Sequence, residues 1–394
     1  MKYKINIQNI VLIQFILGFI IIAGNIFGKP VIVSLCFNFT FIILAFLLFL
    51  ILFEYKFSKK QLITLGILYT IIIITFAGVA YGSNTLSFGY YKKMIMFYST
   101  IIFLFIMMKV NVNRKIISFI ITNNILLGVL YILGYYTVSR RYFAGGLSFH
   151  YTNPNLAAMW LLHTAMYCII GFIYNDKKIK KIWALIVFCY IANFIIKTES
   201  RTSLIALCIF LILVIFIRMR KEIKIPKSIV NMMILSPIII VIVYMGSIES
   251  GFINEFEFME SEGKSVYSRE KVWNHAINEF KLRPILGNYN GISQGTGMSQ
   301  MHNTHLDILA SYGIIVFIVT MIYIMIIVND INKVCRTKLQ LIGLTAFLTI
   351  IVMGFGEAAL FSGGVGMYIL SGGYLLIARY NDFDEHKILI KEKY

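Results

Sequence analysis

The feature that most constrains this chain is a series of long apolar stretches that recur along its whole length. A helix that crosses the hydrocarbon core of a membrane needs roughly 20 mostly apolar residues. Hydrophobic residues make up 59% of the 394 residues and charged residues only 14%, so little of the chain is left for a soluble domain. We therefore predict an all-α integral membrane protein, a single polytopic domain over residues 1–394 with about twelve transmembrane helices. The predicted segments are residues 8–27, 31–53, 61–80, 94–108, 116–136, 155–174, 182–197, 202–217, 229–247, 306–328, 339–359 and 362–380.

The basic residues indicate how these segments cross the membrane. The formal net charge of +18 is high enough for a nucleic-acid-binding protein, but the Lys and Arg residues lie between apolar segments and form no separate basic domain. If the N-terminus is cytoplasmic, the cytoplasmic connections and tails hold two thirds of the 36 basic residues, including KKIKK (177–181) and RMRKEIKIPK (218–227). Basic residues are enriched on the cytoplasmic side of membrane proteins. We therefore expect a multi-pass protein of the cytoplasmic (inner) membrane with both termini cytoplasmic and no nucleic-acid partner.

The connection over residues 247–305 is the longest and is predicted to be a large extracytoplasmic loop between the ninth and tenth segments. It opens with an acidic stretch, ESGFINEFEFMESEG (249–263), and continues as SREKVWNHAINEFKLRPILG (268–287). In the second part Val272, Ala276, Ile277 and Phe280 recur at helical spacing, and Pro284 ends the pattern. We predict an amphipathic helix over residues 268–281, lying on the membrane surface or on the mouth of the bundle.

The same topology places several ionisable side chains at one end of the bundle, which we call the rim. They are Arg140, Arg141, His150, Arg201, Arg269, His302, His305 and Glu357. The planar guanidinium group is well suited to bidentate contact with phosphate oxygens, and an imidazole has the right pKa range to take a proton from a hydroxyl. Arginines beside one base, at the depth of lipid head groups and without a phosphate-cradling Gly-Lys loop, indicate a lipid phosphate or diphosphate as substrate rather than a nucleotide.

Three motifs on the rim carry a resemblance to a known family. They are SRTSLIAL (200–207); Ser268-Arg269 followed by Trp273 and PILG (284–287); and HNTHLDILASYGIIVF (302–317), with His302, Asn303, Leu306, Leu309 and Gly313. A weaker fourth motif is GGLSFHYTNPNLAA (145–158). In these motifs, their order and the position of the large loop, the chain resembles the Wzy_C, or O-antigen ligase and polymerase, superfamily of bacterial envelope glycosyltransferases. The resemblance spans roughly residues 140–320, and it departs from the family pattern at Ser311, where an acidic residue often stands.

The resemblance implies a GT-C-like fold, a polyprenyl-diphosphate-linked glycan donor, and an inverting displacement at the anomeric carbon without a metal ion or other cofactor. Family roles carry over to Arg201 and Arg269 as diphosphate ligands and to His302 as the base or the group that orients the acceptor. Arg140 and Arg141 are further candidate diphosphate ligands. The candidate accessory residues are Asn303, His305, His150, Asn155 and Glu357.

Among the activities of this superfamily we favour a polymerase of O-antigen, capsule or exopolysaccharide. Such an enzyme transfers a glycan from undecaprenyl diphosphate to a sugar hydroxyl of another lipid-linked repeat unit, on the extracytoplasmic face. The sequence has no obvious extra domain for docking a different acceptor, which favours this reading over a ligase. The expected partners are the undecaprenyl-diphosphate-linked donor and acceptor and membrane lipid, with flippase and chain-length regulator proteins as candidates.

Other functions and sites remain open at this point. An O-antigen ligase or a protein O-oligosaccharyltransferase would use the same donor with lipid A core or a protein as acceptor. A lipid-linked glycan flippase or transporter would carry charged residues within its helices, whereas here the charges concentrate on the rim. A metal site formed by His302, His305 and Asp307 is disfavoured, because Asp307 does not share a helical face with the two histidines.

Overall fold

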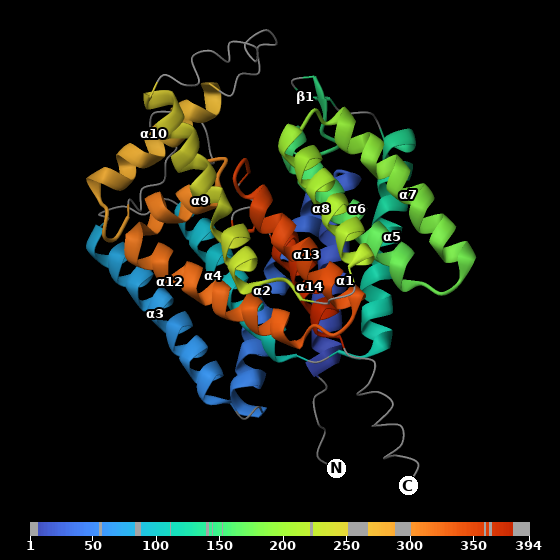
Figure 1. Cartoon of the computed structure of the whole chain (residues 1–394), viewed down its shortest axis with the longest axis horizontal. Coiled ribbons are helices and arrows are strands. Elements are labelled where there is room, and N and C mark those ends of the chain that lie inside the picture. Colours follow the sequence, from blue (N-terminus) through green and yellow to red (C-terminus); the bar gives the residue numbers. More distant parts are fainter. Residues whose placement is uncertain are drawn as a thin grey trace.

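The computed structural model describes residues 7–54, 57–82, 88–110, 112–138, 142–143, 145–151, 153–220, 224–250, 267–287, 301–357, 360–361 and 365–380. These residues form a bundle of helices and one short hairpin (Figure 1). The helices are α1 (Ile7–Ile26), α2 (Pro30–Glu54), α3 (Lys59–Gly82), α4 (Phe88–Lys109), α5 (Arg114–Thr137), α6 (Pro154–Tyr174), α7 (Lys178–Lys197), α8 (Arg201–Met219), α9 (Lys227–Glu249), α10 (Tyr267–Leu282), α12 (Thr304–Val334), α13 (Lys338–Met353) and α14 (Val365–Arg379).

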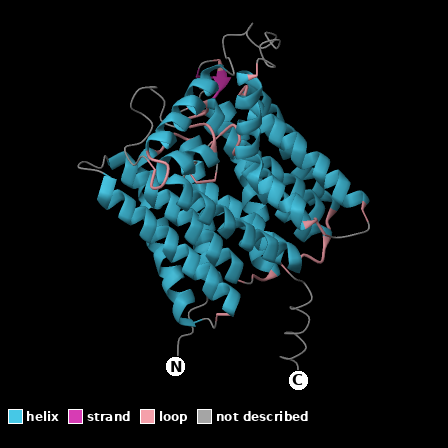
Figure 2. Ribbon diagram, turned by 60° about the vertical axis from the view of Figure 1, so that its left-hand side comes forward, coloured by secondary structure: helices cyan, strands magenta, loops and turns pink. Residues whose placement is uncertain are grey.

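The predicted fold class is confirmed, since each of the twelve predicted segments coincides with a helix and α10 lies where the amphipathic helix is predicted. The only strands among the described residues are β1 (Tyr142–Phe143) and β2 (Gly146–Leu147), which pair antiparallel. Figure 2 shows how small this hairpin is beside the helices. Asparagine caps fix some helix starts: the side chain of Asn113 accepts from the N–H of Ile116, and that of Asn153 from the N–H of Leu156.

Nine helices in the described part of the chain are long and apolar enough to cross a membrane, so the protein is a multi-pass membrane protein. They are α1, α2, α3, α5, α6, α7, α8, α9 and α12. The other three predicted segments form shorter apolar helices: Met94–Lys109 in α4, α13 with 16 residues and α14 with 15 residues. The prediction of a helix over residues 339–359 for the eleventh segment was wrong at the C-terminal end. Helix α13 stops at Met353, and turns follow.

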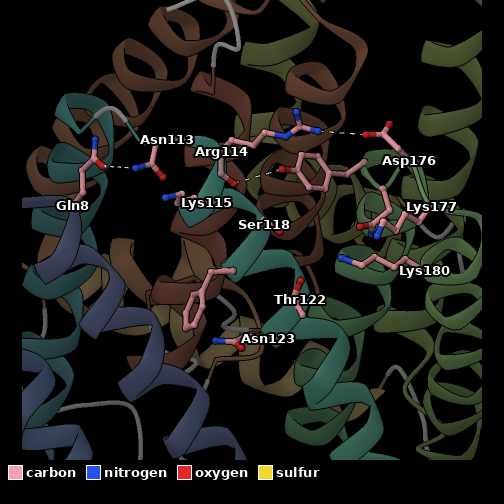
Figure 3. Close-up of a pocket in the computed structure, with 13 residues that line it drawn as sticks. Gln8, Asn113, Arg114, Lys115, Ser118, Thr122, Asn123, Asp176, Lys177 and Lys180 are labelled. Atoms are coloured by element: carbon pink, nitrogen blue, oxygen red, sulfur yellow. Dashed lines mark hydrogen bonds and ion pairs between the residues drawn. The ribbon is translucent and has the colours of Figure 1, made fainter. Parts of the chain in front are cut away.

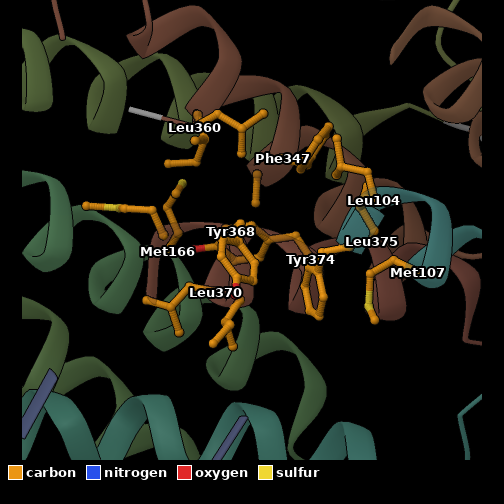
Figure 4. Packing of buried hydrophobic residues seen from close by; sticks show 14 of the residues in the cluster. Leu104, Met107, Met166, Phe347, Leu360, Tyr368, Leu370, Tyr374 and Leu375 are labelled. Carbon is orange, nitrogen blue, oxygen red and sulfur yellow. The ribbon is translucent and has the colours of Figure 1, made fainter. Parts of the chain in front are cut away.

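The core is built around α14, in which every residue over 367–378 is buried. Figure 4 shows its side chains packed against those of α4, α6 and α13. Helices in a membrane gain stability from close packing and from bonds between polar groups rather than from the hydrophobic effect. Two glycines of α14 permit this close packing, since a Cβ at Gly372 would collide with Phe103 and one at Gly373 with the Tyr167 hydroxyl. That hydroxyl donates to the carbonyl of Leu370 at 2.6 Å.

The two ends of the bundle differ. The hairpin and α10 lie at the end where α8 and α12 begin, at the top of Figure 1, which is the rim. At the opposite end α1, α5 and α7 begin and α6 ends. Most of the ionisable residues singled out from the sequence therefore belong to elements that meet at one end of the fold.

The tenth predicted segment, residues 306–328, departs from a regular helix at Gly313. Its φ of +81° and ψ of 176° lie in a region that is essentially restricted to glycine, so α12 is two helical pieces joined by a kink. The kink is where residues 284–287, which we call the strap, dock after α10 ends. The N–H of Ile314 donates to the Pro284 carbonyl at 2.9 Å.

Candidate functional site

His302 lies on a strained backbone just before α12. Its φ is +49°, in the left-handed region that residues other than glycine rarely adopt. The next residue, Asn303, is the N-cap, and its Oδ1 accepts from the N–H of His305 and of Leu306, both at 2.9 Å. Backbone strain of this kind costs roughly 1–3 kcal/mol and clusters at functional sites. The surrounding structure therefore holds His302 in a position that the local sequence does not favour.

The imidazole of His302 faces the carboxylate of Glu357. Nδ1 of His302 lies 3.1 Å from Oε2 of Glu357, and the two side chains are 21% and 3% exposed. Glu357 follows α13, and its carbonyl accepts a bond from the Thr304 hydroxyl at 3.1 Å. An imidazole that donates Nδ1–H to a carboxylate presents Nε2 as a proton acceptor, and the carboxylate stabilises the imidazolium that forms. The pair therefore has the arrangement of a general base with its orienting group.

Asn303 fixes the position of this pair relative to two other helices. Its Nδ2 donates to the carbonyl of Pro237 at 3.0 Å and to that of Phe355 at 3.1 Å, and the residue is fully buried. Pro237 lies inside α9 and has no N–H to donate to the carbonyl of Met233. The Ser236 hydroxyl donates to that carbonyl instead, at 2.9 Å. One asparagine thus joins the start of α12 to the middle of α9 and to the turns that carry Glu357.

Arg201 is the first residue of α8 and is exposed. It follows a second strained residue, Glu199, whose φ is +57°. The N-cap Ser200 makes no side-chain cap, and its hydroxyl donates to Ser203 at 3.3 Å. Ser203 in turn contacts the sulfur of Met353, four residues before Glu357, at 4.0 Å. The first turn of α8 therefore adjoins the segment that holds the His302 partner.

Arg269 is the third residue of α10, and its side chain lies outside the described part of the structure. One turn further along, Val272 and Trp273 are buried in a small apolar cluster with Met301 and Leu306. This cluster holds α10 against the beginning of α12, next to His302. The backbone of Arg269 thus lies beside the rim, one turn before this cluster.

The strap fixes the other end of α10 on the α12 kink. Gly287 has a φ of +79°, and a Cβ there would lie 2.5 Å from the backbone nitrogens of Tyr312 and Gly313. A Cβ at Gly313 would collide with the carbonyl of Ile285 and lie 2.7 Å from the nitrogen of Gly287. Because both residues are glycines, the backbone of the strap directly contacts the backbone at the α12 kink. The sequences PILG (284–287) and ASYG (310–313) form this contact.

The hairpin side of the rim carries the weaker candidates. Arg140 and Arg141 lie outside the described residues. His150 packs on the turn between α1 and α2, where a Cβ at Gly28 would lie 2.8 Å from its Nδ1, and Asn155 is the half-buried second residue of α6. Phe149, which precedes His150, has a φ of +51°. Tyr151 is buried and shares a hydroxyl bond of 2.7 Å with Tyr131, and burial raises its pKa, so it remains protonated.

His305 does not point into the same space as His302. It is 2% exposed, its Nε2 lies 2.8 Å from the carbonyl of Ile234 in α9, and its ring lies edge-on to Phe317. Within the described residues, no group of three or more His, Cys, Asp or Glu side chains could hold a metal ion. His305 is therefore placed as a contact between α9 and α12.

The three strongest candidates share one structural context, because each lies at the beginning of a helix. His302 precedes α12, Arg201 opens α8, and Arg269 is in the first turn of α10. The N-terminus of a helix carries a partial positive charge, so a cation there is unfavourable for the helix itself and an anion is favourable. An anion bound beside these helix starts would be favoured both by the arginines and by the backbone N–H groups.

A comparison with protein-family models gives a match over the part of the chain that carries most of these residues. The Wzy_C family model, described as O-antigen ligase, matches residues 185–321. These residues, about a third of the chain, match a Wzy_C domain. No curated protein matches the chain at a significant level. The family's description supports a membrane enzyme of the O-antigen ligase and polymerase type that acts on lipid-linked oligosaccharides.

The Wzy_C domain contains Arg201, Arg269, His302, the strap and Gly313, whereas Glu357, His150 and Asn155 lie outside it. Sequence reasoning missed two parts of the site. It named Glu357 only as a candidate accessory residue, whereas in the structure Oε2 of Glu357 lies 3.1 Å from Nδ1 of His302. It also missed the kink in α12, although a glycine inside an apolar helical pattern is a signal of a break or a close contact.

Asn303→Asp in the Wzy_C domain is expected to lower the free energy of unfolding by at least about 2 kcal/mol. The aspartate keeps the cap, but it loses both donated bonds and turns a carboxylate towards the carbonyls of Pro237 and Phe355. Thermal unfolding of the detergent-solubilised protein measures the change. The control is Asn153→Asp, which keeps the cap of α6 and should change stability little. Equal losses in the two variants would contradict this role of Asn303.

Proposed function

We propose that the protein is a polysaccharide polymerase that extends an O-antigen, capsule or exopolysaccharide. It transfers a glycan from undecaprenyl diphosphate to a sugar hydroxyl of another lipid-linked repeat unit, with inversion at the anomeric carbon. The observation that carries this proposal is the hydrogen bond between His302 and the buried Glu357, at a strained position beside two helix starts that carry arginines. This is an arrangement for taking a proton from a hydroxyl next to an anionic group.

In the reaction, Nε2 of His302 accepts the proton of the acceptor hydroxyl while its oxygen attacks the anomeric carbon. The bond between that carbon and the diphosphate oxygen breaks, and the electron pair leaves with undecaprenyl diphosphate. Glu357 stabilises the imidazolium, which later returns the proton to solvent. The leaving group is already a diphosphate, so the protein mainly stabilises the developing charge and orients the two reactants, and the proposed step needs no metal ion.

Arg201 and Arg269 are the proposed diphosphate ligands. A guanidinium group can bind two phosphate oxygens at once, and each arginine stands where a helix start adds favourable backbone N–H groups. Arg140 and Arg141, in the connection before the hairpin, are further candidates for the same role. In a GT-C-like arrangement this rim faces the extracytoplasmic side, with both termini in the cytoplasm, so that exported lipid-linked donors reach it from the outer leaflet.

The proposal is tested by incubating the purified full chain with the undecaprenyl-diphosphate-linked repeat unit of its source organism and resolving the products as a glycan ladder. We expect a ladder with the parent protein and a rate about 100-fold lower with Arg201→Ala or Arg269→Ala. Arg218→Ala is the matched control, because Arg218 lies in the last turn of α8, at the other end of the same helix. It should leave the ladder unchanged.

The products also distinguish the alternatives. Transfer of glycan to added lipid A core or to a protein, without a ladder, would identify a ligase or a protein O-oligosaccharyltransferase. Movement of the intact lipid-linked unit across reconstituted vesicles, without any transfer, would identify a flippase. If the polymerase proposal holds, a flippase and a chain-length regulator are the expected protein partners.

A further inference from the structure

A large cavity lies at the end of the bundle opposite to the rim. Its volume is about 1170 Å³, and it is lined by the beginnings of α1, α5 and α7 and the end of α6 (Figure 3). The lining residues are Gln8, Asn113, Arg114, Lys115, Ser118, Phe119, Thr122, Asn123, Tyr174, Asn175, Asp176, Lys177 and Lys180. We call it the basic cavity, because four of these residues are basic and only one is acidic. The proposed chemistry at the rim makes no use of it.

One wall of the basic cavity is a polar stripe on a helix that crosses the membrane. Lys115, Ser118, Thr122 and Asn123 recur at the spacing of one face of α5 and line the cavity together. Asn123 stands nine residues after Arg114, which is about 13 Å along the helix axis. Polar side chains at that depth are unfavourable against lipid tails and mark sites that bind polar groups or water. The stripe therefore extends the cavity from the surface into the membrane.

The charges around the mouth of the basic cavity favour an anion. Arg114 forms an ion pair with Asp176, with Nη2 and Oδ2 3.3 Å apart. None of the ion pairs among the described residues involves Lys115, Lys177 or Lys180. Lys177 is also the N-cap of α7 and makes no side-chain cap bond, so the first N–H groups of α7 add to the positive potential.

The surroundings of the basic cavity indicate a lipid rather than a soluble anion. Beyond Lys180, the outer face of α7 exposes apolar side chains, including Ile182 at 47% and Trp183 at 58%. Exposed apolar residues on a spanning helix contact lipid, and tryptophan is enriched at the level of the head groups. The cations of the cavity thus stand at the depth of lipid phosphates, directly beside the acyl chains.

We propose that the basic cavity binds the phosphate head group of an anionic membrane phospholipid. The lysines hold the phosphate, and Ser118, Thr122 and Asn123 bond the glycerol and ester oxygens below it. Basic pockets between spanning helices are known to bind head groups that carry phosphates. The bound lipid joins the starts of α5 and α7 to α1 at the end of the fold that lies away from the rim.

The test is native mass spectrometry of the full chain in a neutral detergent, with phosphatidylglycerol and phosphatidylcholine of equal chain length added together. The parent protein should retain one phosphatidylglycerol in preference to phosphatidylcholine. Lys177→Gln/Lys180→Gln should weaken that retention about tenfold, because both lysines line the cavity. The matched control is Lys178→Gln/Lys181→Gln, which removes the same charge from the same helix at two residues that do not line the cavity.

Equal weakening by the two double variants would show only a general attraction to basic helix ends and would overturn the proposal. So would equal retention of the two lipids, or displacement of the lipid by millimolar inorganic phosphate or glycerol phosphate, which would indicate a soluble anion. Ser118→Ala/Thr122→Val provides a second variant without a change of charge, and it should weaken retention about threefold. An unfolding curve in the same detergent confirms that each variant is folded before its lipid binding is compared.

Discussion

His302→Asn is expected to lower the rate of glycan transfer by roughly 100- to 10,000-fold without loss of stability. Asparagine adopts the left-handed conformation more readily than most residues, so it fits the φ of +49° at this position. It cannot take a proton from a hydroxyl, however, and so the proposed base is removed while the backbone keeps its conformation. The rate is measured from the glycan ladder, and folding from the unfolding temperature in detergent.

The companion variant Glu357→Gln should have a smaller effect on the same rate. The amide can still bond Nδ1 of His302, but it has no charge with which to stabilise the imidazolium. We expect a loss of about tenfold to 100-fold, between the parent and His302→Asn. A rate of glycan transfer above a tenth of the parent value in His302→Asn would contradict the assignment of the base.

Gly313→Ala is expected to destabilise the protein by at least about 3 kcal/mol. Its φ of +81° and ψ of 176° belong to a region that is essentially closed to alanine, and the new Cβ would collide with the carbonyl of Ile285 in the strap. The kink would have to straighten and the strap would have to leave α12. Thermal unfolding in detergent measures the loss, and tryptic cleavage after Lys281, in the last turn of α10, reports the release of the strap.

The matched control for Gly313→Ala is Gly66→Ala in α3. A Cβ at Gly66 meets no atom within 4 Å, and alanine is the better helix former by roughly 1 kcal/mol, so this variant should be neutral or slightly stabilising. If Gly313→Ala unfolded at the temperature of the parent protein, the strap contact would not contribute to the stability of the rim.

Much of the fold could be predicted from the sequence, because spanning helices are the local solution to burying backbone N–H and C=O groups in lipid. Apolar length alone located α2 and α6, and helical spacing located α10. The prediction failed where contacts between distant parts of the chain determine the local structure. The Gly313 kink depends on a strap that arrives from another part of the chain, and the early end of α13 depends on the turns that carry Glu357.

Sequence patterns named the residues of the candidate site but not the pairs that they form. Arginine and histidine near predicted helix ends pointed to His302 and Arg201, since those residue types suit anion binding and proton transfer. No sequence spacing relates His302 to Glu357, because 55 residues separate them and the bond exists only once α12 and α13 pack together. The positive φ of Glu199 was likewise not predictable, because glutamate rarely adopts a positive φ.

The helix starts at α8, α10 and α12 have a consequence for how such an enzyme could diversify. Under the proposed function, backbone N–H groups and guanidinium groups at these positions engage the diphosphate, which is common to every polyprenyl-diphosphate-linked donor. Under the proposed function, the invariant part of the substrate is held by the scaffold, and the identity of the sugar is left to other surfaces. Changes in those surfaces could then redirect the enzyme to a new glycan while the chemistry stays the same.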